Sequence, residues 1–340
     1  MRSAWAPVGL AALTAGLTPT TVLAHVKWFE DPSAYPLRLD LAISGRTGLL
    51  LAVAAVALGM LYGVQRLAGD PHWPRFRFLR RMAVGAPTLL AVQSAITLVY
   101  AAVQPALLVP NMRLQVDAGG LTIGAIQLLV AFAFITGIAD WFAAIALILL
   151  GPLGFLLFPV HDVVDQLHWL GIALVILVIG RYAADIRDER PWFAQRGPAW
   201  SARAVASLRV ITGIAIIAPA LSEKIWNPGL GAAFLTDHPQ FNFPRAFLGQ
   251  TWMSDDLFVL AAGLVEGTIG VLLISGLLTR LVILGMWLPF NLGIPFLPPQ
   301  ELIGHLPIFG IMYLLLVQSA GIAPGESVHR PEPLGVPRLR

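Results

Sequence analysis

The chain alternates between long apolar runs and short polar segments along its whole length. The apolar runs fall at about 46–66, 82–104, 119–138, 142–158, 166–181, 206–226, 256–276, 281–297 and 303–320. Runs of about 18 residues or more are long enough to cross a hydrocarbon core of roughly 30 Å. In lipid, a single segment pairs all its backbone groups only as a helix. The pattern therefore predicts an all-α integral membrane protein with about nine transmembrane helices in a lipid bilayer.

Composition agrees with this prediction and excludes several kinds of site. The chain is 57% hydrophobic and only 12% charged, whereas soluble domains average about 25% charged residues. Its basic residues lie between the apolar runs, where they orient a chain in a membrane, so no nucleic-acid partner is predicted. The absence of cysteine excludes disulfides, thiolate metal sites and cysteine-ligated iron–sulfur clusters on this chain.

Residues 1–24 have the pattern of a signal peptide. Arg2 supplies a positive charge, a modest apolar stretch follows at 8–13, and Val22-Leu23-Ala24 resembles a small-residue cleavage site. Cleavage after Ala24 would leave His25 at the mature N-terminus, and the alternative is an uncleaved signal anchor. In either case the segment 25–45 is predicted to lie outside the cytoplasm.

The distribution of charge predicts the orientation. Most of the 22 Lys and Arg residues fall in loops that become cytoplasmic when the N-terminus is outside and nine helices follow. The acidic and His residues gather on the other side. We therefore expect a multi-pass protein of the bacterial inner membrane, with its C-terminus in the cytoplasm.

The spacing of polar and glycine residues indicates an internal repeat. Two sets of residues recur with unchanged spacing. The first set is Arg81, Gly85 and Ser94, which recurs as Arg209, Gly213 and Ser222. The second set is Gly124, Gln127, Gly137 and Pro159, which recurs as Gly263, Glu266, Gly276 and Pro298. The pattern predicts two parallel four-helix units, 81–181 and 206–320, related by a pseudo-two-fold axis along the membrane normal. The remaining segments are an extra helix at 46–67, a cytoplasmic linker at 182–205 and a cytoplasmic tail at 321–340.

The second unit resembles the DoxX/DoxD-like membrane family over about residues 205–320. The resemblance rests on Arg209-x-x-x-Gly213, Ser222-Glu223-Lys224, Gly263-x-x-Glu266-x-x-x-Gly270 and Ser275-Gly276-Leu277-Leu278-Thr279-Arg280. The segment 81–181 resembles a diverged copy, with Gln127 where the second unit has Glu266. The resemblance implies a four-helix membrane unit that is often associated with quinone-linked or other respiratory oxidoreductases.

Three charged residues of the second unit are candidates for catalysis. Glu266 is predicted near the middle of its helix, where a charge costs at least ~2.5 kcal/mol and therefore usually faces a polar interior. It is either a proton-handling group beside a bound quinone or a protonated acid that bonds a neighbouring helix. Glu223 and Lys224 end the first helix of the unit, either as a head-group or substrate contact or as an interfacial pair with Lys224 snorkelling outward.

Histidines suggest two further sites. His168 and His305 begin the last helix of each predicted unit, and two neutral imidazoles at one depth could hold a haem b iron, whereas the plainer interpretation is two interfacial polar residues. His161, Asp162 and Asp165 lie in an outer segment whose ligand types suit Zn, Cu or Fe, with His161 and Asp162 as the proposed ligands, and a solvated loop is the alternative. A free His25 amino terminus could chelate copper with its own imidazole.

Three function hypotheses follow from the sequence. The first is a membrane subunit of a respiratory or quinone-linked redox system, with Glu266 on a proton or quinone path and a periplasmic electron-transfer or oxidoreductase partner. The second is a periplasm-facing protein that handles or transports copper or iron. The third is a membrane assembly factor without a ligand.

Overall fold

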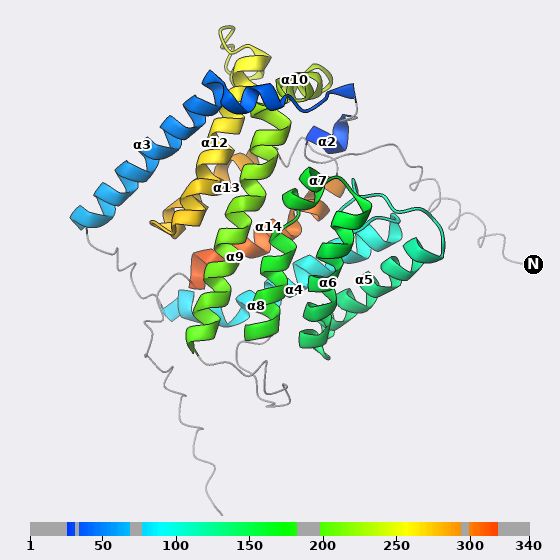
Figure 1. Cartoon of the computed structure of the whole chain (residues 1–340). Helices are drawn as coiled ribbons and strands as arrows, with labels where there is room; N and C mark the ends of the chain where they lie inside the picture. Colours follow the sequence, from blue (N-terminus) through cyan, green and yellow to red (C-terminus); the bar gives the residue numbers. More distant parts are fainter. Residues whose placement is uncertain (1–25, 31–33, 69–76, 182–197, 294–298, 319–340) are drawn as a thin grey trace, which may run out of the picture.

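The described part of the computed structural model, residues 26–30, 34–68, 77–181, 198–293 and 299–318, is helical and contains no strand (Figure 1). Its longer helices are α3 (Gly45–Ala68), α4 (Arg77–Val103), α5 (Ala118–Thr136), α6 (Asp140–Leu157), α8 (His168–Ile179), α9 (Pro198–Pro219), α12 (Asp255–Ser275), α13 (Thr279–Gly293) and α14 (Pro299–Gln318). The short ones are α2 (Val26–Phe29), η2 (Leu39–Ile43), α7 (Val160–Asp165), η3 (Ala220–Ile225), α10 (Pro228–Asp237), η4 (Pro239–Phe241) and α11 (Phe243–Ala246).

The prediction of a multi-pass all-α membrane protein is confirmed. Each predicted apolar run coincides with one of the longer helices, and six spans within the described residues have the length and hydropathy to cross a bilayer. These spans are Gly45–Leu67, Met82–Val103, Ala118–Thr136, Asp140–Leu157, Ala199–Ile225 and Asp255–Ser275. The apolar helices His168–Ile179 and Leu302–Gln318 are shorter, so the total of nine crossings stays a prediction.

The predicted linker 182–205 is too long at its C-terminal end. Helix α9 begins at Pro198, since a proline fits the first helical turn, where its missing N–H has no partner to lose, and the Ala-rich segment after it favours a helix. The rest of that linker, the signal segment 1–24 and the tail 321–340 lie outside the described residues.

The long helices form two closed rings of neighbours. In the first, α4 packs on α5, α5 on α6, α6 on α8 and α8 on α4; in the second, α9, α12, α13 and α14 pack in the same cyclic order. Between the rings, α4 packs on α14 and α9 packs on α8. Each cross-contact thus joins the first helix of one ring to the last helix of the other, which is the arrangement that a pseudo-two-fold axis produces.

The same turn occurs at corresponding places in both rings. Helix α5 ends at Gly137 with φ 81°, and two residues later Ala139 has φ 52° just before α6. Helix α12 ends at Gly276 with φ 76°, and Leu278 has φ 42° just before α13. A positive φ is uncommon for residues other than glycine, so its recurrence at the same offset supports the predicted repeat.

Arginines of the family-like motifs bond the ends of helices. The Arg209 guanidinium donates to the carbonyl oxygens of Leu273 and Ile274 in the last turn of α12. Arg280 Nε donates to the Leu316 carbonyl near the end of α14 at 2.9 Å. The last carbonyls of a helix have no partner within the helix, and a cation there also complements the helix dipole. These two arginines therefore stabilise the scaffold.

Candidate functional site

A π-helical turn carries the site on the second ring. Pro219, the last residue of α9, has no N–H to donate to the preceding turn, and the chain continues as the π-helix η3. The wider turn closes with a hydrogen bond from the Trp226 N–H to the Leu221 carbonyl at 2.8 Å. Such turns frequently occur at functional sites, and this one presents Glu223 and Lys224.

Lys27 of α2 lies among three carboxylates from two distant parts of the chain. Its Nζ is 2.6 Å from Asp165 Oδ2, 3.2 Å from Asp162 Oδ1 and 3.8 Å from Glu223 Oε1. The Val26 N–H also donates to Glu223 Oε2 at 3.1 Å. The side chain of Lys27 is only 4% exposed and that of Glu223 is fully buried. The segment α2 is therefore held to α7 and η3 by buried ionic contacts.

A second ion pair extends the site into α12. Lys224 Nζ donates to Glu266 Oε2 at 2.8 Å. Gly263, one turn before Glu266, leaves room for this lysine, because a Cβ there would lie 3.1 Å from Lys224 Cβ. Glu223 precedes Lys224 in the chain and lies within electrostatic range of Lys27, Lys224 and Glu266, so the two groups of contacts are neighbours. We call Lys27, Asp162, Asp165, Glu223, Lys224 and Glu266 the lysine–carboxylate cluster.

Both lysines of the chain belong to this cluster. All other basic residues, apart from histidine, are arginines: of the 22 Lys and Arg, only Lys27 and Lys224 are lysines. The lysine ammonium is a compact point charge with three donors, whereas the arginine guanidinium is a planar fork. The restriction of lysine to the cluster indicates that these two positions favour the compact ammonium group.

The cluster has four carboxyl groups and two ammonium groups, so it favours additional protons. Burial raises the pKa of Asp165 to about 7, and the nearby Lys27 only partly opposes this effect. For Lys27, burial lowers the pKa but the carboxylates of Asp165 and Glu223 outweigh it, so its pKa lies above the ordinary value. Asp165 Oδ1 and Glu223 Oε1 are buried and have no hydrogen-bond partner among the described residues. The cluster can therefore hold and release a proton near neutral pH.

The cluster reaches the surface of the described structure at both ends. The Asp162 side chain is 17% exposed at the end of the bundle that carries α2, whereas the Glu266 side chain is 30% exposed on the membrane-spanning helix α12. Glu223 lies between them and is fully buried. The arrangement connects a partly exposed carboxyl group on α7 to a partly exposed carboxyl group on the candidate span α12.

The predicted catalytic residues Glu223, Lys224 and Glu266 are thus brought together. The interpretation of Glu223 and Lys224 as an interfacial pair with Lys224 snorkelling outward is wrong, because Lys224 pairs with Glu266 on α12 and Glu223 is fully buried beside Lys27. The π-turn, in which consecutive side chains leave the helix in different directions, separates the two.

The structure does not bring the predicted histidine ligands His161 and His168 together on one helix. His161 is half-exposed, with Nε2 3.6 Å from Asp162 Oδ1, whereas His168 is buried beside the Trp169 ring. The break between α7 and α8 places these two histidines on different helices. His168 lies within electrostatic range of His305, which leaves the haem hypothesis a prediction.

A metal site also stays a prediction. Within the described ranges no group of three or more His, Asp or Glu side chains is arranged to hold a metal ion, and the Lys27 ammonium lies between Asp162 and Asp165. His25, the candidate copper ligand, lies outside the described residues.

Sequence reasoning missed Lys27 as part of the site. It grouped Asp165 with His161 and Asp162 in an outer segment, whereas the structure shows Asp165 as the buried last residue of α7. Lys27 lies 138 residues away from Asp165 along the chain, so no local pattern links them. The signal that could have found the site is the presence of two lysines among many arginines, one of them beside Glu223.

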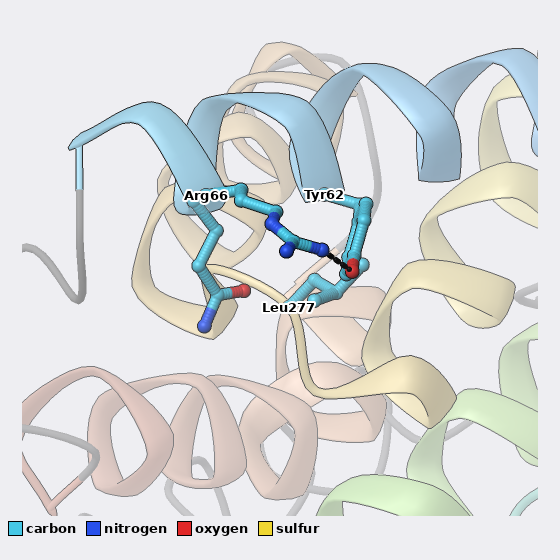
Figure 2. A pocket seen from close by; sticks show the side chains of 4 residues that line it. Tyr62, Arg66 and Leu277 are labelled. Carbon is cyan, nitrogen blue, oxygen red and sulfur yellow. Dashed lines mark hydrogen bonds between the residues drawn. The ribbon is translucent and has the colours of Figure 1, made fainter.

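A separate pocket lies beside the C-terminal end of α3 (Figure 2). It is shallow, has a volume of about 360 Å³ and is lined by Tyr62, Gln65, Arg66 and Leu277. Arg66 Nη1 donates to the Tyr62 hydroxyl at 3.0 Å, and Leu277 belongs to the turn between α12 and α13. None of the residues of the lysine–carboxylate cluster lines this pocket.

Comparison of the chain with family models, with characterised proteins and with solved structures gives no match.

Proposed function

We propose that the chain is an inner-membrane subunit of a quinone-linked redox system, in which the lysine–carboxylate cluster carries protons between the outer side and Glu266. The observation that supports this function best is the linked set of ionisable side chains from Asp162 through Lys27 and Glu223 to Lys224 and Glu266. Ionisable groups inside membrane segments commonly mark proton relays. The resemblance of residues 205–320 to the DoxX/DoxD-like family agrees with this class of function.

The Lys224–Glu266 pair fits the polar head of a quinone. A carboxyl group and an ammonium group supply an acceptor and donors for quinone oxygens, and the 30% exposed side chain of Glu266 can be reached from the apolar layer. A bound quinone would supply two-electron, two-proton redox chemistry. A periplasmic electron-transfer protein would exchange the electrons.

The protein's own residues handle the proton. Glu266 accepts or donates it, while the Lys224 ammonium stabilises the ionised carboxylate. Glu223 connects this pair to Lys27 and Asp165. Asp165 then exchanges a proton with Asp162 and the outer solution, since its pKa of about 7 leaves it partly protonated near neutral pH. Buried carboxyl groups in this range lose and regain protons without a large free-energy cost.

The quinone content of the purified protein tests the proposal. We expect quinone in solvent extracts of the parent protein and, after Glu266→Gln, about tenfold less, because a loss of ~1.4 kcal/mol in binding free energy lowers affinity tenfold. Asp256→Asn is the matched control, since Asp256 is an acid on the same helix that pairs with Arg46 at an exposed site. Its quinone content should equal that of the parent.

Other outcomes would favour the competing hypotheses. A quinone-free parent, or equal quinone in the parent and Glu266→Gln, contradicts the quinone site. Stoichiometric copper or iron that disappears after His25→Ala would favour metal handling. An empty protein that co-purifies with an oxidase would favour an assembly factor.

A further inference from the structure

The three carboxyl groups around Lys27 form a receptor-like site. Asp162 and Asp165 come from α7 and Glu223 comes from η3, and their oxygens converge on the Lys27 ammonium at 2.6 to 3.8 Å. We call Asp162, Asp165 and Glu223 the ammonium socket. We propose that this socket binds primary ammonium groups, that Lys27 is its built-in ligand, and that the seated Lys27 closes the α2 end of the lysine–carboxylate cluster.

The chemistry of the socket matches an alkylammonium ion. An –NH₃⁺ group has three donors; the Lys27 ammonium donates to Asp165 Oδ2, while Asp162 Oδ1 and Glu223 Oε1 lie at ion-pair distance and have no hydrogen-bond partner among the described residues. The planar arginine guanidinium has a different donor geometry. Although arginine supplies 20 of the 22 basic residues, the socket holds one of the two lysines.

The position of α2 explains why Lys27 acts as a closure. The segment Val26–Phe29 packs on α10 at the upper end of the bundle in Figure 1. Both Val26 and Lys27 are buried, and the Val26 N–H bonds the same Glu223 carboxylate that faces Lys27. The Lys27 side chain and the α2 backbone therefore cover Glu223, which leads to Lys224 and Glu266.

Removal of Lys27 alone would leave the socket unbalanced. Asp162 and Asp165 would lose the lysine that pairs with them, and Lys224, which is bonded to Glu266, would be the lysine left within electrostatic range of Glu223. A buried carboxylate that loses its cation is destabilising unless a proton or another cation replaces it. An external ammonium ion is a substitute that restores the lost N–H donors as well as the charge. This inference does not depend on the presence of a quinone.

Chemical rescue tests the ligand class. We expect Lys27→Ala to lower the Tm of the detergent-purified protein and ethylammonium chloride to restore at least half of the loss. Tetramethylammonium chloride at the same concentration is the control, because it has the charge but no N–H donors. No loss of Tm in Lys27→Ala, or equal effects of the two salts on this variant, would overturn the proposal.

Lysine acylation tests the closure in the protein with Lys27 intact, so the proposal stays testable if Lys27→Ala does not fold. The chain has two lysines, which makes peptide assignment by mass spectrometry direct. In the variant Leu248→Lys the introduced amine lies at an exposed position and serves as the internal reference. A membrane-impermeant acylating reagent should modify Lys27 at least about tenfold more slowly than the reference amine, because protected groups react only through local opening.

A second substitution distinguishes ion pairing in the socket from burial alone as the cause of slow Lys27 acylation. Asp165→Asn removes the closest partner of Lys27 and nearly preserves the side-chain volume. It should accelerate acylation of Lys27 several-fold while the reference amine is unchanged. Equal reactivity of Lys27 and the reference amine, or no effect of Asp165→Asn, would show that the socket does not hold the lysine.

Discussion

The two helix rings use the same place in their second helix in opposite ways. In α5, Gln127 is fully buried and its amide bonds the loop after α4, donating to the Ala106 carbonyl at 2.8 Å and accepting from the Leu108 N–H at 2.6 Å. In α12, Glu266 bonds the Lys224 ammonium instead. A neutral amide fixes backbone in one ring, whereas an ion pair occupies the corresponding position in the other.

The first helices of the two rings also differ in their ionisable residues. Helix α4 continues to Val103 without a π-turn, and Ser94 is followed by Ala95 and Ile96. In the second ring, Ser222 is followed by Glu223 and Lys224 in the π-helix η3. The comparison teaches that helix packing is shared, while the ion pair between the first and second helices occurs in the ring that contains Glu223, Lys224 and Glu266.

A carboxylate introduced into the first ring should produce the largest effect. We expect Gln127→Glu to cost about 1–3 kcal/mol, because it removes the donor to Ala106 and leaves a buried acid without a cation. Thermal unfolding in detergent measures the loss. Glu266→Gln should cost less, since the Glu266 side chain is 30% exposed, whereas Gln127 is fully buried.

A compensating variant sharpens this test. Ile96 has the same spacing from Ser94 as Lys224 has from Ser222, so the double variant Gln127→Glu/Ile96→Lys should recover part of the lost stability. A parent-like Tm in Gln127→Glu would contradict the distinction between the rings.

Two glycines at corresponding places give a matched pair with a smaller expected effect. A Cβ at Gly263 would lie 2.9 Å from Ile225 Cγ1 and 3.1 Å from Lys224 Cβ, whereas a Cβ at Gly124 would meet only the Ala102 carbonyl at 3.7 Å. Gly263→Ala should therefore destabilise by about 1 kcal/mol or more through overpacking.

Gly124→Ala should be neutral or stabilising by up to ~1 kcal/mol through helix propensity. Unfolding of both variants under one condition makes the comparison. Equal changes in Tm would show that the approach of Lys224 to α12 is not tight.

A pH slope in the stability of the protein should arise from Asp165. Its pKa is about 7 in the folded protein against an ordinary value of 3.8, so between these values the folded state binds more protons than the unfolded state. The contribution of Asp165 to stability is therefore present at low pH and is lost as the pH rises toward 7. Lys27 has its pKa raised above 10.5 and gives no slope in this window.

Thermal unfolding at several pH values between 4 and 7 measures this slope. Asp165→Asn should flatten the decrease of Tm with pH, because it removes the carboxyl group that titrates in this window. Asp256→Asn should keep the parent slope. A parent slope that persists in Asp165→Asn would assign the titration to another group.

The sequence predicted the helices and part of the site for different physical reasons. Hydrocarbon thickness requires long apolar runs, so the helix positions follow from hydropathy alone. The cost of a charge in lipid singled out Glu266, and Glu223 and Lys224 stood out as charged residues at the end of a predicted helix. The contact of Lys27 with Asp165 was missed because it joins α2 to α7 through tertiary packing.

The connection between the two ends of the lysine–carboxylate cluster is the central claim. Difference infrared spectroscopy of carboxyl protonation, in the parent, Asp165→Asn and Glu266→Gln, tests it most directly. Interacting acids titrate together, so removal of Asp165 should shift the titration of the remaining carboxyl groups, including the signal that Glu266→Gln removes. If the Glu266 signal titrates identically with and without Asp165, the two ends are independent and the proposed proton path is contradicted.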